Sequence, residues 1–157
     1  MSAVLNATAF NAGLDRAEER FQRMFKERVR RLVHTGMRSL IAKTPVNTGE
    51  AIMNYVASSG TPSGSHRRAG KAVEATNKLA LGAEKLRGPA AAISFATLAT
   101  VSFDDPYKVY WITNNTPHIG GLEHGLLPEA PYVPRSPAGM FAVTIQELMQ
   151  LLGSGTL

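Results

Sequence analysis

The chain has 157 residues, of which 44% are hydrophobic and 18% are charged, and it contains no Cys. This length and mixture predict a single globular domain, residues 1–157, with enough apolar surface to form a core. The missing Cys excludes a disulfide framework, thiol catalysis and cysteine-ligated metal. We expect residues 1–10 to form an N-terminal arm, and their sequence lacks the pattern of a secretory signal. We expect no membrane partner, since the 16 uncharged residues 88–103 are fewer than the roughly 20 apolar residues of a span.

The formal net charge of +5 is unevenly distributed along the chain. Residues 15–43 hold nine Lys or Arg against four Asp or Glu, residues 66–87 hold six against two, and residues 103–157 hold two against five. A basic front and an acidic back favour contacts between copies of the chain or with neighbouring proteins. They also allow a polyanion to lie against the basic part, so that charge alone does not separate assembly from DNA binding.

Apolar residues recur at helical spacing from Asn11 to Ile41 and predict a long N-terminal helix. Asn11 is its expected cap, and the Thr44-Pro45 pair is its expected end, because Pro disfavours helical backbone in the residue before it. The opposite face carries Arg16, Arg20, Arg23, Arg30 and Arg31. The simplest interpretation of this face is a solvated surface, and the alternative is a contact with a neighbouring subunit or with DNA.

The middle of the chain alternates short apolar stretches with loops. Ala51–Ala57 predicts a strand, Ser58–Ser65 a loop, and Ala69–Leu86 a short helix that Gly82 weakens. We expect residues 58–88 as a whole to form a variable basic excursion. Its candidate contacts with DNA or a partner are His66, Arg67, Arg68 and Lys71.

The last third predicts most of the sheet and a second helix. Ala91–Phe103 and Tyr107–Thr113 are rich in β-branched and aromatic residues, which predicts two antiparallel strands joined by an Asp-Asp-Pro turn. Asn114–Tyr132 predicts a long loop, and Ser136-Pro137 predicts the start of a helix that ends at Gly153. The expected fold is therefore α+β, with a long N-terminal helix and a C-terminal helix packed on a small, mostly antiparallel sheet, plus a long basic loop or helix excursion.

One cluster offers groups that transfer protons or bind metal, namely His118, Glu123 and His124. Neither helical zinc spacing of His and Glu is present, and the Gly120-Gly121 pair argues against a helix that would aim these side chains together. No phosphate-binding glycine motif occurs. We therefore expect no enzymatic activity, cofactor or metal, and a small hydrolase or metalloprotein remains the alternative.

The segment Thr44–Gly49 reads Thr-Pro-Val-Asn-Thr-Gly and has a simple physical interpretation as a turn. Pro45 fixes φ, Asn47 can close an Asx-turn, and Gly49 can adopt a positive φ. The chain can then turn sharply from the long helix into the next element.

The same segment resembles a block of the tail-completion, or neck, family of long-tailed double-stranded DNA phages. The resemblance extends over roughly residues 11–152, through a basic helix, this turn, a variable loop and a sheet, to a Glu-x-Gly, a Pro-aromatic-Pro stretch and a last helix near Gly-Met. The chain departs from the family at Asn47, where Asp is usual, and at His118, near a common Tyr-Ala pair. The residues that carry the match are Thr44, Pro45, Val46, Asn47, Thr48, Gly49, Glu123 and Gly125.

The resemblance implies a structural protein of the virion, present in the host cytoplasm during assembly. It would be a tail-completion or head-tail joining subunit in an oligomeric ring, by analogy a hexamer, at the head-proximal end of the tail. The implied partners are neighbouring neck proteins, tail-terminator or tail-tube proteins, head-completion or portal-side proteins, and non-specifically the DNA in the lumen. The alternatives are a tail-terminator or head-closure (stopper) protein of the same neck and, from another class, a basic DNA-binding accessory protein.

Overall fold

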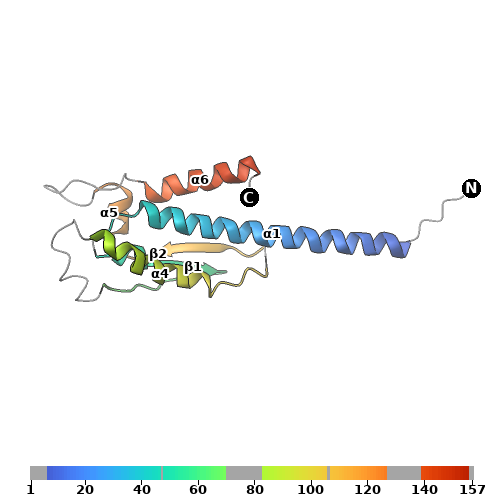
Figure 1. Ribbon diagram of the computed structural model, residues 1–157, viewed down its shortest axis with the longest axis horizontal. Helices are drawn as coiled ribbons and strands as arrows, with labels where there is room; N and C mark the ends of the chain where they lie inside the picture. Colours follow the sequence, from blue (N-terminus) through green and yellow to red (C-terminus); the bar gives the residue numbers. More distant parts are fainter. Residues whose placement is uncertain (1–6, 47, 70–82, 106, 127–138, 156–157) are drawn as a thin grey trace, which may run out of the picture.

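The computed structural model describes residues 7–46, 48–69, 83–105, 107–126 and 139–155 (Figure 1). The chain forms α1 (Ala7–Lys43), α2 (Glu50–Met53), β1 (Tyr55–Ser59), the short 3-10 helix η1 (Ala83–Leu86), α4 (Arg87–Leu98), β2 (Tyr110–Asn114), α5 (Ile119–Glu123) and α6 (Met140–Ser154). A long N-terminal helix, a C-terminal helix and a small antiparallel sheet are thus present, which confirms the predicted α+β class.

The C-terminal half of α1 lies between α6 on one side and the sheet on the other (Figure 1). Helix α6 runs antiparallel to α1, since Thr144 is hydrogen-bonded to Ser39 at 2.8 Å while Leu148 faces Gly36, one turn earlier in α1. A Cβ at Gly36 would lie 3.2 Å from both Leu148 Cδ1 in α6 and Ile112 Cδ1 in β2. The missing side chain at Gly36 therefore lets all three layers approach.

The two strands pair antiparallel, with Tyr55 opposite Asn114 and Ala57 opposite Ile112. Tyr55 and Ala57 face the core that α1 covers. On the opposite face the indole N–H of Trp111 donates to the Gly60 carbonyl at 3.1 Å, and the Thr113 hydroxyl donates to the Ser63 carbonyl at 3.1 Å. The loop after β1 therefore folds back over the second face of the sheet.

The core joins the end of α1 to α2, β1 and α4, and Ile112 of β2 and Phe141 of α6 pack against it. Its buried residues are Met37, Leu40, Ile41, Val46, Ile52, Tyr55, Ala57, Ala90, Ala91 and Leu98. A small polar network lies inside this core, where the Thr44 hydroxyl donates to the Leu40 carbonyl at 2.7 Å and is hydrogen-bonded to the Tyr55 hydroxyl at 2.8 Å. Burial raises the pKa of Tyr55 far above its usual value, so the phenol stays protonated in this network.

The strand predicted at Ala91–Phe103 is wrong, because residues up to Leu98 belong to α4. Three small residues of this helix (Ala90, Ala91 and Ser94) are buried, and Ala favours helix over strand. Two side chains then satisfy groups of the neighbouring elements: Ser94 donates to the Ile52 carbonyl at 2.5 Å, and Thr97 accepts from the Ala57 N–H at 3.0 Å. Helix α4 therefore lies against β1 where a third strand was expected.

The expected strand at Ala51–Ala57 is displaced, since its first residues form α2 and β1 begins only at Tyr55. The loop predicted at Ser58–Ser65 starts two residues later than expected, because β1 continues to Ser59. The strand predicted at Tyr107–Thr113 begins only at Tyr110, as β2, and its partner is β1. Most of the helix predicted at Ala69–Leu86 lies outside the described residues.

The helix ends also differ from expectation. Helix α1 begins at Ala7, so Asn11 is not its cap and residues 7–10 of the predicted arm are helical. The predicted end at Thr44-Pro45 is correct, since α1 stops at Lys43. Helix α6 extends to Ser154, past the predicted end at Gly153, and the predicted start at Ser136-Pro137 lies outside the described residues.

Candidate functional site

In the turn after α1, Gly49 leaves the space in which α4 packs. Gly49 has a φ of +78°, as predicted, and a Cβ there would lie 3.2 Å from the Cβ of Ala90 in α4. Val46 is buried in the core, and the Thr48 hydroxyl accepts from the Glu50 N–H at 3.2 Å. The Asx-turn expected at Asn47 lies outside the described residues. This turn therefore fixes where α1 ends relative to α2 and α4.

The Arg87 side chain, from the first residue of α4, caps the C-terminal end of α1. The Arg87 guanidinium donates from Nη1 to the carbonyls of Ile41 at 2.5 Å and Thr44 at 3.1 Å. A positive side chain is favourable there, because the last carbonyls of a helix lack intrahelical partners and carry partial negative charge. Sequence analysis missed this role, since no local pattern links residues more than forty positions apart.

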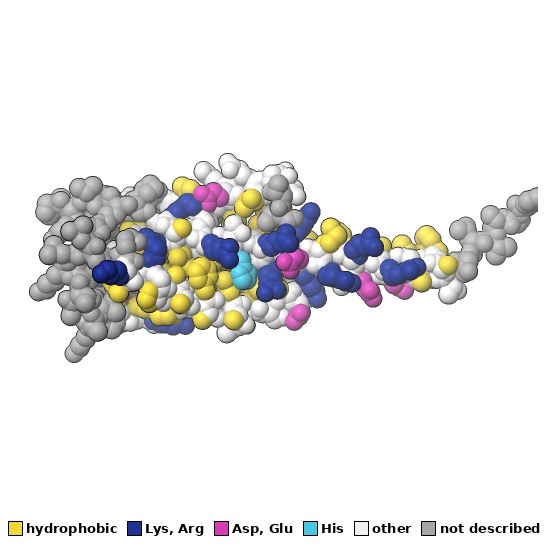
Figure 2. All heavy atoms as spheres, in the orientation of Figure 1, with side chains coloured by type: hydrophobic (Ala, Val, Ile, Leu, Met, Phe, Trp, Pro, Cys, Tyr) yellow, Lys and Arg dark blue, Asp and Glu magenta, His cyan; other side chains and the backbone are white. Residues whose placement is uncertain are grey.

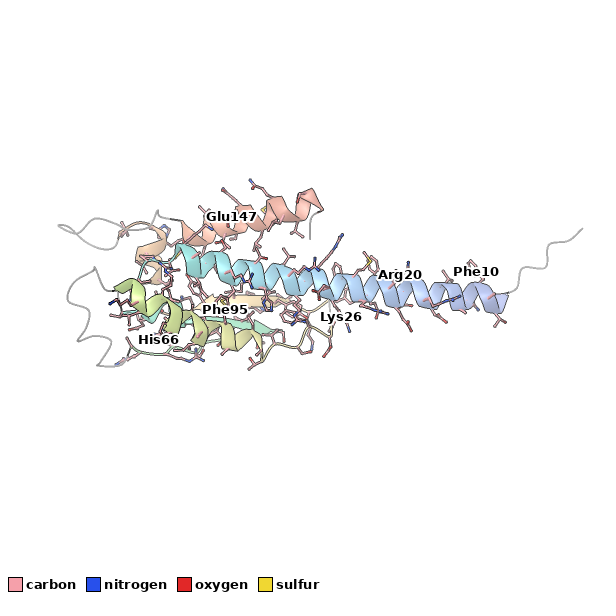
Figure 3. All side chains as sticks on the ribbon, viewed as in Figure 1. Phe10, Arg20, Lys26, His66, Phe95 and Glu147 are labelled. Carbon is pink, nitrogen blue, oxygen red and sulfur yellow. The ribbon has the colours of Figure 1, made fainter. Side chains whose placement is uncertain are left out.

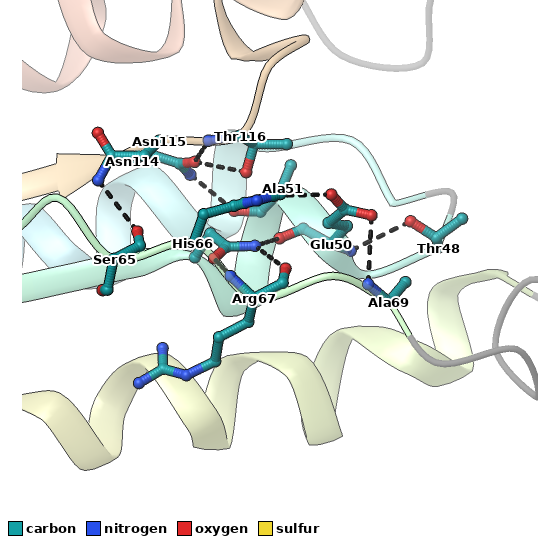
Figure 4. Close-up of polar contacts among 11 residues, drawn as sticks. Thr48, Glu50, Ala51, Ser65, His66, Arg67, Ala69, Asn114, Asn115 and Thr116 are labelled. Atoms are coloured by element: carbon teal, nitrogen blue, oxygen red, sulfur yellow. Dashed lines mark hydrogen bonds and ion pairs between the residues drawn. The ribbon is translucent and has the colours of Figure 1, made fainter.

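Two asparagine side chains hold the backbone of the basic loop before Gly70 (Figure 4). The Asn54 side chain donates to the Arg67 carbonyl at 2.6 Å and accepts from the Arg67 N–H at 2.6 Å, as a neighbouring strand would. Asn115 donates to the carbonyls of Ser63 at 2.7 Å and Ser65 at 3.0 Å. The side chains of Arg67 and Arg68 stay exposed, and Lys71 lies outside the described residues.

Glu50 anchors the end of this loop. Its Oε1 lies 2.9 Å from His66 Nε2, and its Oε2 accepts from the Ala69 N–H at 3.3 Å. Burial on its own would raise the pKa of Glu50, but the bonds from Ala69 and His66 outweigh it and lower the pKa below its usual value. The ionised carboxylate therefore stabilises the loop at neutral pH, and this contribution is lost as the pH falls through the lowered pKa. His66 is thus part of an anchor, not a free basic group.

Glu123 and Gly125, the Glu-x-Gly of the resemblance, join two helices. The Glu123 carboxylate accepts from the N–H groups of Phe141 at 2.8 Å and Ala142 at 3.2 Å, so it caps the start of α6. Gly125 has a φ of +68°, which lets the Leu126 N–H donate to the Gly121 carbonyl at 2.8 Å and close α5. The predicted loop thus contains a helix despite Gly120-Gly121.

This cap accounts for Glu123 without catalysis. His118 and His124 flank α5 as its two end residues, and both are exposed. Within the described ranges, no group of three His, Asp or Glu side chains is arranged to hold a metal ion. The carboxylate that sequence analysis grouped with two histidines is engaged with the backbone of α6 instead.

Replacing Glu123 by Ala is expected to lower the free energy of unfolding by about 1–2 kcal/mol, because two backbone N–H groups at the start of α6 lose their acceptor. Glu123→Gln, which keeps one acceptor oxygen, should lose less. Urea unfolding followed by circular dichroism measures both changes. His124→Ala is the control, and equal stability of the Ala variants at positions 123 and 124 would contradict the capping role.

The basic face of α1 stays open to solvent. Arg20 and Lys26 project from the helix in Figure 3, and dark blue side chains follow α1 in Figure 2. Burial lowers the pKa of His34, and the nearby Arg30 and Arg38 lower it further, as expected beside a concentration of positive charge. Arg31 is paired with Glu27 of its own helix, at 3.4 Å.

The N-terminal part of α1, residues 7–24, extends beyond the rest of the fold, and we refer to it as the α1 projection (Figure 1). Every residue in it except Gln22 is exposed. Its large apolar side chains are among those left uncovered: Phe10 is 60% exposed, Leu14 53%, Phe21 60% and Met24 52%. The body begins near Phe25, whose ring centroid lies 6.0 Å from that of Tyr107. Sequence analysis predicted an apolar stripe along this helix, and within the projection that stripe is exposed.

None of the described helices combines the length and the hydropathy that a membrane crossing requires. No family model, no curated protein and no solved structure matches the chain.

Proposed function

We propose that the chain is a structural virion protein of a phage neck, a tail-completion or head-tail joining subunit that acts in an oligomeric ring. The observation that carries the proposal is the α1 projection, whose aromatic and aliphatic side chains find no cover in the fold of the described residues. Exposed apolar surface of this kind is typical of a protein that functions in contact with other subunits. The motif residues Gly49, Glu123 and Gly125 support it, because each lies at a junction between elements of this fold.

The partners follow from the position in the particle. In this proposal the ring, by analogy a hexamer, lies between tail-terminator or tail-tube proteins and head-completion or portal-side proteins. The exposed arginines of α1, together with Arg67 and Arg68, suit non-specific contact with DNA passing through the lumen. A head-closure or tail-terminator role would use the same surfaces at a neighbouring level of the neck.

Particles assembled without the protein test this role. Electron micrographs are expected to show complete tails beside DNA-filled heads that are not joined, with joining restored by added wild-type protein. Tails of wrong length would indicate a terminator instead, and heads that leak DNA would indicate a stopper. Normal particles would overturn the proposal.

The second candidate, a DNA-binding accessory protein, is favoured by the exposed arginine face of α1. It predicts that the isolated protein binds duplex DNA tightly and that the affinity falls steeply with salt. A neck subunit needs only weak contact with DNA. Fluorescence anisotropy of a labelled duplex at several salt concentrations distinguishes the two, and tight binding without assembly would favour the accessory role.

A further inference from the structure

The apolar residues of the α1 projection form one seam. Its members are Phe10, Leu14, Ala17, Phe21 and Met24, spaced alternately by four and three residues. This spacing keeps the side chains on a single narrow line along a helix and is typical of helices that pack lengthwise against another helix. All five residues are exposed in the fold. The seam is therefore suited to packing against a second helix along its length.

A second seam of the same kind runs along α6. Its members are Ala142, Ile145, Met149 and Leu152, at intervals of three, four and three. Ile145 is 56% exposed, Met149 66% and Leu152 57%. The side of α6 that contacts α1 is a different one, formed by Met140, Thr144 and Leu148. Helix α6 is therefore apolar on two sides, of which the described residues cover one.

The two seams do not meet within one chain. Helix α6 lies along the C-terminal half of α1, with Thr144 at Ser39 and Leu148 at Gly36. The projection continues past the end of α6 and away from the body (Figures 1 and 3). A rigid helix cannot fold back onto α6, so neither seam is covered by the other within the described part of the chain.

We propose that the α1 projection of one copy packs along the α6 seam of the next copy, head to tail. This inference rests on the proposed function in one respect, the assembly of the chain with copies of itself. A heterologous contact of this type covers both seams at once, and it closes into a ring when the rotation between copies allows. The lengths agree: at 1.5 Å per residue the projection is about 27 Å long and α6 about 22 Å.

The charges permit the same contact. Glu147 is the one charged residue of α6, and its carboxylate is bonded to Lys43 at 2.7 Å and to Ser39 at 2.6 Å. No base lies on α6 to repel the arginines of the projection. The uncharged Gln146 borders the α6 seam and can hydrogen-bond an arginine or a glutamate that follows the seam on the arriving helix.

Two variants test the contact, Phe21→Asp on the projection and Met149→Asp on α6. Both sites are more than half exposed, so the folded chain should persist, and circular dichroism and thermal unfolding check this. The controls are Ala12→Asp on the projection and Gln150→Asp on α6, exposed residues of the same helices that lie outside the seams. Sedimentation velocity measures the assembly state of the full chain.

Wild type and both controls are expected to assemble, and each seam variant alone to weaken assembly more than tenfold. An equal mixture of the two seam variants should form 1:1 dimers that grow no further. The Met149→Asp copy still offers an intact projection, and the Phe21→Asp copy still offers an intact α6, but their remaining surfaces are both damaged.

Three results would overturn the inference. Normal assembly of Met149→Asp would indicate that projections pair with each other, a monomeric mixture would show that the seams do not meet, and a monomeric wild type would mean that the seams cover another protein. None of these results decides whether particles without the protein fail to join. Conversely, normal particles would overturn the proposed function while leaving a measured head-to-tail contact in place.

Discussion

Gly49→Val is expected to lower the free energy of unfolding by about 3 kcal/mol or more, and with it the melting temperature by about 6–12 °C. Two costs add at this position. A β-branched residue is strained at a φ of +78°, and its Cβ would press to 3.2 Å from the Cβ of Ala90 in α4. Thermal unfolding of the purified protein measures the change. Under the proposed function, particles that carry the variant should also fail to join heads to tails.

Two other glycines separate these costs. Gly60 has a φ of +82° with nothing within 4 Å of a built Cβ, so Gly60→Val should show the backbone strain alone. Gly64 has open space and no positive φ, so Gly64→Val should stay within about 0.5 kcal/mol of wild type. The expected order of stability is wild type and position 64, then 60, then 49. If the variants at 49 and 60 lose the same amount, the close approach of α4 is not what requires the glycine.

Tyr55→Ala is expected to cost about 3–5 kcal/mol, because it removes a ring that is 0% exposed at the centre of the core. The ring joins the end of α1 to the start of α6: its hydroxyl lies 2.8 Å from Thr44 Oγ1, and its centroid lies 5.9 Å from that of Phe141. Urea unfolding gives the free energy directly.

Tyr55→Phe is the matched variant, since it keeps the ring and removes only the hydroxyl. It should cost about 1 kcal/mol, the typical contribution of one hydrogen bond. A cost equal to that of Tyr55→Ala would place the stabilisation in the polar network with Thr44 instead of in packing. A Tyr55→Ala variant within 1 kcal/mol of wild type would show that the two helices are joined elsewhere.

The sequence predicted correctly those elements that have strong local signals. A sustained 3.6-residue period predicts α1, and Pro45 predicts its end, because both effects act within a few residues. The positive φ of Gly49 follows from the same kind of local reasoning. The α+β class required no more than the two helical patterns and one clear strand.

The features that the sequence did not predict depend on contacts between residues far apart in the chain. The segment Ala91–Phe103 has the composition of a strand or a helix, and the burial of small residues against β1 decides for a helix. The roles of Asn54, Arg87 and Glu123 depend on partners 13 to 46 positions away. Gly36 is similar, since only the layers on both sides of α1 explain why a side chain is absent there.

The candidate site was predicted in its residues but not in its arrangement. Gly49 and Glu123 were chosen from a family pattern, and each proves to be a junction between elements of the fold. His66, predicted as a candidate contact with DNA or a partner, lies 2.9 Å from the Glu50 carboxylate. The α1 seam was visible as a periodic apolar stripe. Periodicity alone cannot distinguish a stripe that packs on the core of its own chain from one that packs on a second chain.

The chain leaves and re-enters the described fold at one place. Ala69 donates to the Glu50 carboxylate at 3.3 Å, and the Leu86 carbonyl lies 3.8 Å from a Cβ built at the adjacent Gly49. The described chain on either side of residues 70–82 therefore contacts the same turn. For a flexible connection between two points that are fixed close together, doubling the length costs only about 0.6 kcal/mol of closure entropy. An epitope or fluorescent label inserted between Ala69 and Ala83 is therefore expected to leave the core undisturbed.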